Sequence, residues 1–394
     1  MRTLAPWTEQ FQHFVGAVRE EFWGDLYRQT REVWQQSLER LSVEARDQYL
    51  GVREYERQPG RQDTRNGFYE REVVTVFGTL RIRVARTRQQ AFLPQGLPRL
   101  QRRAPEVTLL IREAFLRGIS TRSVGRLIAL LTEEPVSAQT VSRLSRDLDG
   151  AVAQFHRAPL GDDWRYLFLD GVSLRVRRPH GRRRVQLLVA YGVRADGTRQ
   201  LLAFTQSRGE SQVAWEGLLQ DLYRRGVEGQ SLQLVVTDGC PGLAAALQTV
   251  YPRIPHQRCW VHKLRNVLGR VRRHDHAAVK AALQTIYQAN SRREAEAQAR
   301  EFARRWQPLY PLVVQRVLQD LPELLAFLQC PRSLWRKLRT TNAIERCFVE
   351  VRRRTRPMVC FVNVQSMERI IYSIFNRFNL EWHQRTLREF TQAA

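Results

Sequence analysis

Lysine is nearly absent from this chain of 394 residues, in which only Lys263, Lys280 and Lys337 occur. Lys and Arg together nevertheless number 64 against 39 acidic residues, so the formal net charge is +25 and almost all positive charge is arginine. Genomic base composition can exchange Arg for Lys, but it does not produce an excess of bases over acids. We expect a polyanionic partner, since the planar guanidinium group suits phosphate. A passive nucleic-acid-binding protein of the ribosomal kind would satisfy the charge equally well.

Cysteine is also scarce, and long apolar runs are missing. The cysteines are odd in number and lack the spacing of a disulfide framework, which favours a reducing compartment. They are Cys240, Cys259, Cys330, Cys347 and Cys360. The first residues lack the apolar core of a signal peptide, and no apolar run approaches the length of a membrane span. We therefore expect a soluble, cytoplasmic protein with no membrane partner.

The chain is too long for one ordinary core, so two or three domains are expected. Apolar residues recur at helical spacing near the start, which predicts an N-terminal helical region over residues 1–58. Residues 59–103 follow, in which EVVTVF, Gly78 and TLRIRVA indicate a short β-hairpin. Arg81 and Arg83 alternate with apolar residues there, so one face of the hairpin is basic.

Residues 104–158 contain short helical segments, with Ser120 and Ser137 as expected N-caps. Two of these helices, joined by the turn TEEPV, resemble a helix-turn-helix whose second helix enters the major groove of DNA. The side chains that would then face DNA are Gln139, Thr140, Arg143 and Arg146. Many helix pairs have this pattern without touching DNA, so a purely structural pair is the alternative.

The centre of the chain changes character. Strand patterns occur at residues 166–176, 184–193, 199–205, 232–237 and 256–260, with helices at 211–225 and 241–250. Three successive strands followed by alternating helix and strand indicate a mixed α/β sheet. This core spans residues 159–274 and resumes over 337–394, where helices begin near Asn342 and Val364. The stretch 275–336 is helical throughout and interrupts the core.

Asp170 and Asp238 lie at or inside apolar strands, in YLFLDGVSLRV and LQLVVTDGCPG. A buried carboxylate is costly unless a positive group meets it. The apolar pattern continues past Asp170-Gly171, whereas Asp196-Gly197 separates two apolar strands and is typical of a hairpin turn. A charge inside an unbroken strand indicates a functional site.

Asp238 ends its strand and precedes a helix, where ligands gather in α/β sheets, although a helix cap is a common alternative. If the two strands pair side by side, both carboxylates meet and a divalent metal is the natural occupant. Glu345 is the candidate third ligand, although Asn342 and Glu345 also form a capping-box pattern. Glu350, flanked by arginines, is expected to make ion pairs instead.

Cys259 and His262 form a Cys-x-x-His segment, which is half of a zinc site. Cys240 and His256 would supply the other ligands, but their spacing fits no common zinc module. We favour a buried Cys and a His that form hydrogen bonds near the carboxylates.

Two arginine clusters prolong the strand that carries Asp170 and the helix that carries Glu345. They consist of Arg175, Arg177, Arg178, Arg182, Arg183 and Arg184, and of Arg352, Arg353, Arg354 and Arg356. We interpret both as DNA-binding groups that position phosphates beside the chemistry, although a charge run is often only a solvated surface.

Four segments resemble the signature blocks of the Mutator-type transposases of bacterial insertion sequences. They are YLFLDGVSLRVRR, VVTDGCPGLAAAL, QRCWVHKLRNV and TTNAIERCFVEVRRRTRPM. The resemblance implies a ribonuclease-H-like core with an all-helical insertion between the second Asp and the Glu. It implies that Asp170, Asp238 and Glu345 are the acidic catalytic triad and metal ligands, and that Cys259 and His262 support the site.

The resemblance further implies a transposase that binds the ends of its element and catalyses metal-dependent strand cleavage and strand transfer. Two Mg²⁺ or Mn²⁺ ions held by the three carboxylates would activate water and stabilise the leaving 3′ oxygen. The expected partners are element ends, target DNA and a second copy of the chain, in the nucleoid. The alternatives are a DNA-binding regulator on an inactive transposase core, a zinc-stabilised scaffold, and a repair or RNA-directed nuclease.

Overall fold

The computed structural model describes residues 13, 24–52, 56, 63–89, 92–94, 102–116, 119, 121–132, 136–178, 181–355, 361 and 363–383. The predictions for Ser120 and Arg356 lie outside these residues, and so do the side chains of Arg177, Arg178, Arg182 and Arg183. The chain divides into two compact units, Met1–Asp147 and Leu148–Ala394. The finer boundaries at residues 58, 103, 158, 274 and 336 stay predictions.

The first unit contains the hairpin expected from the sequence. Helix α2 (Gly24–Leu50) packs on strands β1 (Arg65–Thr75) and β2 (Gly78–Thr87), which pair antiparallel. Alternate residues of the two strands form a small apolar core, which consists of Val73, Leu80, Ile82 and Val84. Arg81 and Arg83 lie on the exposed face, as predicted, and they form ion pairs with Glu70 and Glu39.

Three short helices complete the described part of this unit: α3 (Pro105–Leu116), α4 (Thr121–Thr132) and α5 (Ala138–Ser145). Ser137 caps α5 as predicted, because its Oγ accepts from the Thr140 backbone N–H at 3.1 Å. Gly125 allows a close approach between α4 and the start of α5, since an added Cβ would lie 2.2 Å from the Val136 carbonyl oxygen. Val141 is buried against this contact region of the helix pair, whereas Arg143 points outward.

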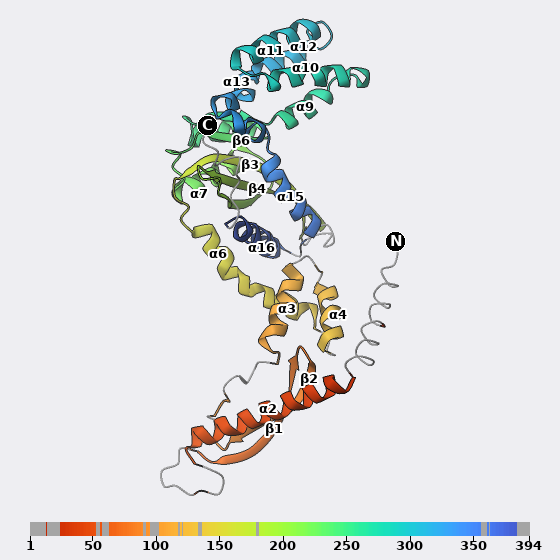
Figure 1. Cartoon of the computed structure of the whole chain (residues 1–394), viewed down its shortest axis with the longest axis vertical. Helices are drawn as coiled ribbons and strands as arrows, with labels where there is room; N and C mark the ends of the chain where they lie inside the picture. The colour runs from red at the N-terminus through yellow and green to blue at the C-terminus, as the bar shows by residue number, and fades with distance from the viewer. Residues whose placement is uncertain are drawn as a thin grey trace. The chain divides into compact units, whose positions relative to one another are not determined.

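The second unit is built on a mixed five-stranded sheet (Figure 1). Its strands are β3 (Trp164–Arg178), β4 (Gly181–Arg194), β5 (Arg199–Ser207), β6 (Leu234–Thr237) and β7 (His256–Arg258). The spatial order is β5-β4-β3-β6-β7, with β3, β4 and β5 antiparallel and β6 and β7 parallel to β3. The predicted mixed α/β sheet is therefore confirmed.

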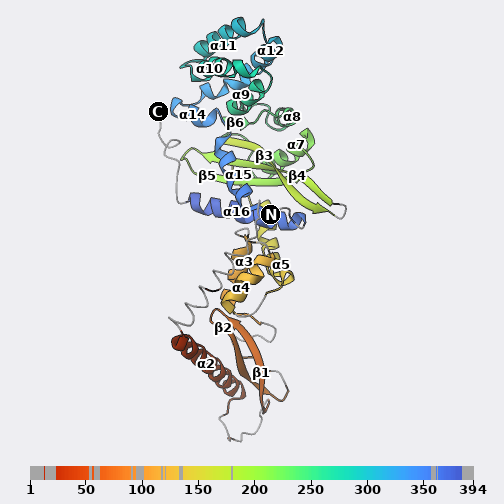
Figure 2. The same ribbon diagram turned by 90° about the vertical axis from the view of Figure 1, so that its right-hand side faces the viewer.

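Helices cover both faces of this sheet (Figure 2). On one face, α7 (Gln212–Arg224) and α8 (Pro241–Val250) pack on apolar side chains that include Leu167 and Leu169 of β3. On the other face lie α6 (Asp149–Arg157), α15 (Asn342–Thr355) and α16 (Val364–His383), with Phe375 against Phe204. Because side chains alternate along a strand, Phe168 and Asp170 belong to this second face.

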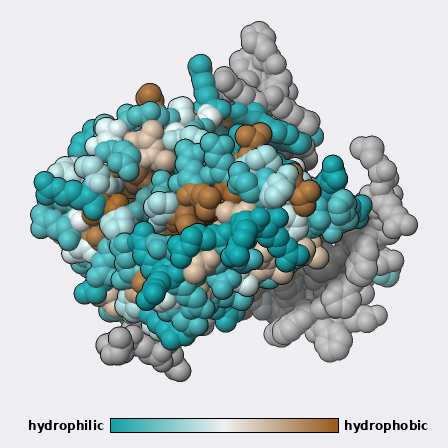
Figure 3. Space-filling view, turned by 90° about the horizontal axis from the view of Figure 1, so that it is seen from above, coloured by the Kyte–Doolittle hydropathy of each residue, from teal (hydrophilic) through white to brown (hydrophobic). Residues whose placement is uncertain are grey.

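Between the sheet and α15 the chain forms a helical segment. It contains α9 (Trp260–Leu268), α10 (His276–Gln288), α11 (Arg292–Trp306), α12 (Pro311–Gln319), α13 (Leu321–Leu324) and α14 (Trp335–Leu338). Arg258 at the end of β7 ties this segment to the sheet through Glu323, with Nη2 and Oε2 2.7 Å apart. Hydrophilic residues dominate the outer face seen in Figure 3. Within the described ranges, no helix has the length and apolarity needed to cross a membrane.

Candidate active site

The register of the sheet brings Asp170 and Asp238 side by side. Leu169 of β3 pairs with Thr237 of β6 in the parallel ladder, so Asp170 and Asp238 occupy the next positions on the two adjacent strands. Asp170 lies within β3, which continues to Arg178, and Asp238 follows the last residue of β6. The structure thus agrees with both sequence expectations, an unbroken strand at Asp170 and a strand end at Asp238.

The carboxyl group of Asp170 is buried and lies near another negative charge. Its side chain belongs to a residue that is only 7 % exposed, and burial together with the charge of Asp238 raises the pKa of Asp170 to about 7. The Gly171 backbone N–H, which donates to Asp170 Oδ1 at 2.7 Å, and the charge of His262 act in the opposite direction. The charge of Glu345 raises the pKa further, so both other predicted carboxylates act on Asp170.

Glu345 reaches this region from the first turn of α15. The helix buries Ile344, Phe348 and Val351, which leaves Glu345 beside the packed stripe. The Glu345 backbone N–H donates to the Thr341 carbonyl oxygen at 3.0 Å, so it belongs to the ordinary helical hydrogen bonding. Its carboxylate accepts a hydrogen bond from the Thr341 hydroxyl and lies beside His262.

Cys259, His262 and Thr341 form a connected group that holds Glu345. The Thr341 hydroxyl lies 3.4 Å from Cys259 Sγ, 3.5 Å from His262 Nδ1 and 3.2 Å from Glu345 Oε1. His262 Nε2 lies 3.4 Å from Glu345 Oε1. The hydrogen bond with Cys259 outweighs burial and raises the pKa of His262 to about 9, so the imidazole is positively charged at neutral pH. Burial alone would raise the pKa of Cys259, but hydrogen bonds with His262 and Thr341 lower it.

The other two residues of the zinc hypothesis have different partners. His256 Nε2 lies 2.7 Å from Thr237 Oγ1, and its Nδ1 lies 3.5 Å from Glu323 Oε2. Cys240 Sγ donates to the Glu210 carbonyl oxygen at 3.5 Å. Cys259 and His262 therefore interact with the carboxylate site rather than with these two residues.

Sequence reasoning missed a fourth acidic residue, Glu210, which precedes α7. A Cβ added at Gly171 would lie 2.5 Å from Glu210 Oε1, so the missing side chain of Gly171 gives the carboxylate room against β3. Burial, followed by the charge of Asp238, raises the pKa of Glu210. Its neighbours SRGES are polar, so the sequence pattern does not separate it from a solvated loop residue.

The donor chemistry of the site fits a divalent cation. Asp170 and Asp238 are oxygen ligands of the kind that Mg²⁺ and Mn²⁺ prefer, and their mutual repulsion favours a cation between them. Within the part of the chain that the structure describes, no three His, Cys, Asp or Glu side chains converge closely enough to hold one metal ion together. Asp170 and Asp238 are therefore the two residues that could share a cation, and Glu345 contacts Thr341 and His262.

The predicted DNA-binding arginines have different surroundings. Arg143 and Arg146 are exposed on and just after α5, and Arg175 is exposed on β3. Arg352 and Arg353 are exposed on α15, whereas Arg354 is 12 % exposed and bonded to Glu350 at 2.7 Å. Glu350 makes ion pairs, as predicted. Among these arginines, the charged groups that lie exposed to solvent are those of Arg143, Arg146, Arg175, Arg352 and Arg353.

Comparison with known proteins shows that the chain belongs to the Mutator family of transposases, whose family model matches residues 18–385. The transposase for insertion sequence element IS905 of Lactococcus lactis is 31% identical over 332 residues, 84% of this chain and 84% of that protein. The transposase for IS406 of Burkholderia multivorans is 32% identical over 340 residues, 86% of this chain and 87% of that protein. The transposase for IS256 in transposon Tn4001 of Staphylococcus aureus is 30% identical over 347 residues, which cover 87% of this chain and 88% of that protein.

Proposed function

We propose that this protein is a DNA transposase that binds the ends of an insertion sequence and uses Asp170, Asp238 and Glu345 for strand cleavage and strand transfer. The observation that carries the catalytic assignment is the pairing of β3 with β6, which makes Asp170 and Asp238 neighbours. The raised pKa of Asp170, caused by burial and by Asp238, supports it, because such strained acids are typical of active sites. Family membership supports the overall activity.

We also propose that the core is ribonuclease-H-like. Three antiparallel strands followed by two parallel ones, in the order β5-β4-β3-β6-β7, support this assignment. The central strand β3 carries the first acid, its parallel neighbour β6 leads to the second, and a helix after the helical segment supplies the third. This order of elements supports the proposed core and the three proposed positions.

Each group has a distinct task in this proposal. Asp170 and Asp238 would hold the divalent cation, and Glu345, which contacts Thr341 and His262, would be the third ligand. Two Mg²⁺ or Mn²⁺ ions would activate the attacking water or 3′-hydroxyl and stabilise the leaving 3′ oxygen. Arginines would position the DNA backbone: Arg143 and Arg146 on the element end, and Arg175, Arg177, Arg178, Arg352, Arg353 and Arg354 beside the chemistry.

A cleavage assay on duplexes that carry the element's terminal sequence tests the catalytic assignment. Asp170→Asn and Asp238→Asn should each reduce Mg²⁺-dependent nicking to the level seen with a chelator, while DNA binding persists. Asp196→Asn is the matched control, because Asp196 caps the β4–β5 turn through Thr198 and lies in no acidic cluster. Cleavage retained by either purified variant would overturn the assignment. A wild-type protein that binds the end duplex without cleaving it would favour a DNA-binding regulator.

A homodimer belongs to the same proposal, because transposition joins two element ends in one complex. Light scattering of the protein with end DNA tests it. A complex that holds two chains is expected, and a strictly monomeric complex would count against it.

A further inference from the structure

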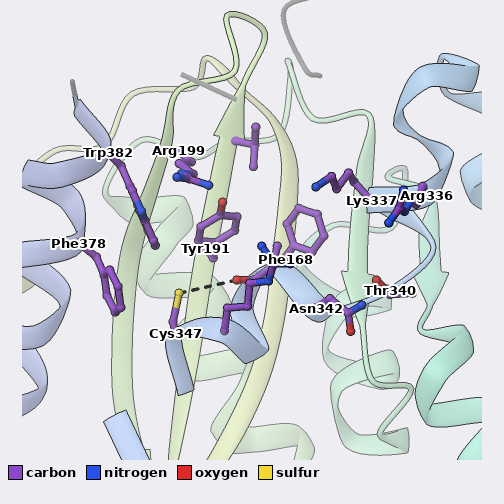
Figure 4. A pocket seen from close by; sticks show the side chains of 13 residues that line it. Phe168, Tyr191, Arg199, Arg336, Lys337, Thr340, Asn342, Cys347, Phe378 and Trp382 are labelled. Carbon is purple, nitrogen blue, oxygen red and sulfur yellow. Dashed lines mark hydrogen bonds between the residues drawn. The ribbon is translucent and has the colours of Figure 1, made fainter. Parts of the chain in front are cut away.

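A cavity of about 340 Å³ lies over strands β3 and β4 and is lined by residues of α14, α15 and α16 (Figure 4). Its floor includes Phe168, which precedes Asp170 by two residues on β3 and therefore lies about 7 Å from it along the strand. Asn342 and Arg346 of α15 also line it, and they flank Glu345 in the same helix. Close sequence neighbours of two of the three predicted catalytic carboxylates therefore line the cavity.

One wall of the cavity is aromatic. Phe378 and Trp382 of α16 stack with ring centroids 5.0 Å apart and an interplanar angle of 18°. Tyr191 of β4 meets Trp382 edge to face, with centroids 5.6 Å apart. Phe378 and Trp382 are half-buried in this position and give the cavity an aromatic lining.

The opposite wall is cationic. Figure 4 shows Arg336 and Lys337 across the cavity from Phe378 and Trp382. Arg346 adds a third positive charge, and Arg199 places its guanidinium 4.7 Å from the Trp382 ring centroid. Among the described residues that line the cavity, none is acidic. An anionic ligand with a flat aromatic part matches this lining.

We propose that this cavity binds one unpaired nucleotide of the DNA strand, next to the phosphodiester bond that the carboxylates cleave. The proposal rests on the proposed function. Aromatic side chains stack on any base, and arginine and lysine bind the phosphate. The volume is at the lower end of the range for small-ligand sites, about 300–1,000 Å³, which suits a single nucleotide. A base in duplex DNA has to leave the stack to enter such a pocket, as it does in enzymes that act on an extruded base.

Photochemical cross-linking tests this proposal with the full chain. A single-stranded oligodeoxynucleotide that carries 5-iododeoxyuridine, a thymidine analogue, is bound and irradiated, and the attachment site is mapped by mass spectrometry. We expect attachment at Trp382, Phe378 or Tyr191. Trp382→Ala should lower the cross-linking yield about tenfold, the loss expected for one base–aromatic stack.

Two further variants separate the pocket from general DNA binding. Arg336→Ala, at an exposed residue, should lower the same yield without disturbing the fold, whereas Arg300→Ala, an exposed arginine on α11 outside the cavity lining, should not. An oligonucleotide that binds but attaches only elsewhere overturns the proposal. The proposal is also overturned if free iododeoxyuridine monophosphate labels the cavity more strongly than the oligonucleotide does, because that result would indicate a site for free nucleotides. Failure to bind DNA at all would contradict the proposed function itself.

Discussion

At the scale of one residue, Asp170 is a carboxyl group whose burial lowers the free energy of unfolding. It sits in a strand whose neighbours Leu169 and Val172 are buried and apolar, and it faces a second carboxylate. Burying an ion in such surroundings costs free energy that packing alone does not return. In the proposed function, the position lowers the free energy of unfolding in exchange for catalysis, as is common at active sites.

This cost predicts a gain in stability when the charge is removed. Because the folded-state pKa of Asp170 is raised above the unfolded value, stability that is present at acidic pH is lost as pH rises from about 4 to 7. Asp170→Asn should therefore raise the free energy of unfolding by about 1–3 kcal/mol at pH 8 in the presence of a chelator. The difference from the wild type should shrink toward pH 4. Urea denaturation at both pH values measures it, and an equal or lower stability at pH 8 would contradict the account.

Glu210 gives a second prediction at this scale. Its carboxylate lies against Gly171 and shares the negative field of Asp238, so it strengthens the attraction of the site for cations. Glu210→Gln should raise the Mg²⁺ concentration needed for half-maximal cleavage by about tenfold or more, the usual effect of removing a group just outside a metal's ligands.

Glu216→Gln serves as the control for Glu210, because Glu216 lies farther along α7 and accepts a hydrogen bond from Gln212 at 2.8 Å. If both variants need the same Mg²⁺ concentration as the wild type, Glu210 belongs to the loop and not to the site.

At the scale of elements, the α4–α5 pair depends on one close contact. The Gly125 backbone approaches the Val136 carbonyl so closely that a methyl group has no room. Gly125→Ala should destabilise the pair by about 1–3 kcal/mol, the cost of overpacking. Amide hydrogen exchange of residues 121–145 should then accelerate about tenfold or more.

The matched control is Gly217→Ala in α7, where an added Cβ meets nothing within 4 Å. Replacing a glycine inside a helix without a clash should stabilise that helix by about 0.5–1 kcal/mol. Unchanged exchange in the Gly125 variant would show that the two helices pack more loosely than the structure has them.

The sequence predicts the elements of the core well and the site only in part. Apolar strands around Asp170 and Asp238 have strong patterns, and a charge inside one of them is visible without a structure. The parallel pairing of β3 with β6 comes from tertiary contacts, so the adjacency of the two acids was a hypothesis until the register was known. Glu210 and Trp382 were not predicted. Glu210 lies in a polar loop and Trp382 in a helix, and neither sequence pattern indicates which residues the side chain contacts in the folded protein.

At the scale of the whole molecule, the net charge of +25 predicts that DNA affinity depends strongly on salt concentration. If 6–10 phosphates are contacted, affinity for a random duplex should fall by about 10³–10⁵ between about 50 and 200 mM salt. Fluorescence anisotropy at several salt concentrations measures the slope. An affinity that hardly changes with salt would show that the arginines do not bind the DNA backbone.

The central claim is that Asp170 and Asp238 share a divalent cation. The most direct measurement is anomalous diffraction from a crystal soaked in Mn²⁺. The account predicts a peak between the two carboxylates, with Glu345 within reach. Asp170 and Asp238 far apart, with no metal near either, would contradict it.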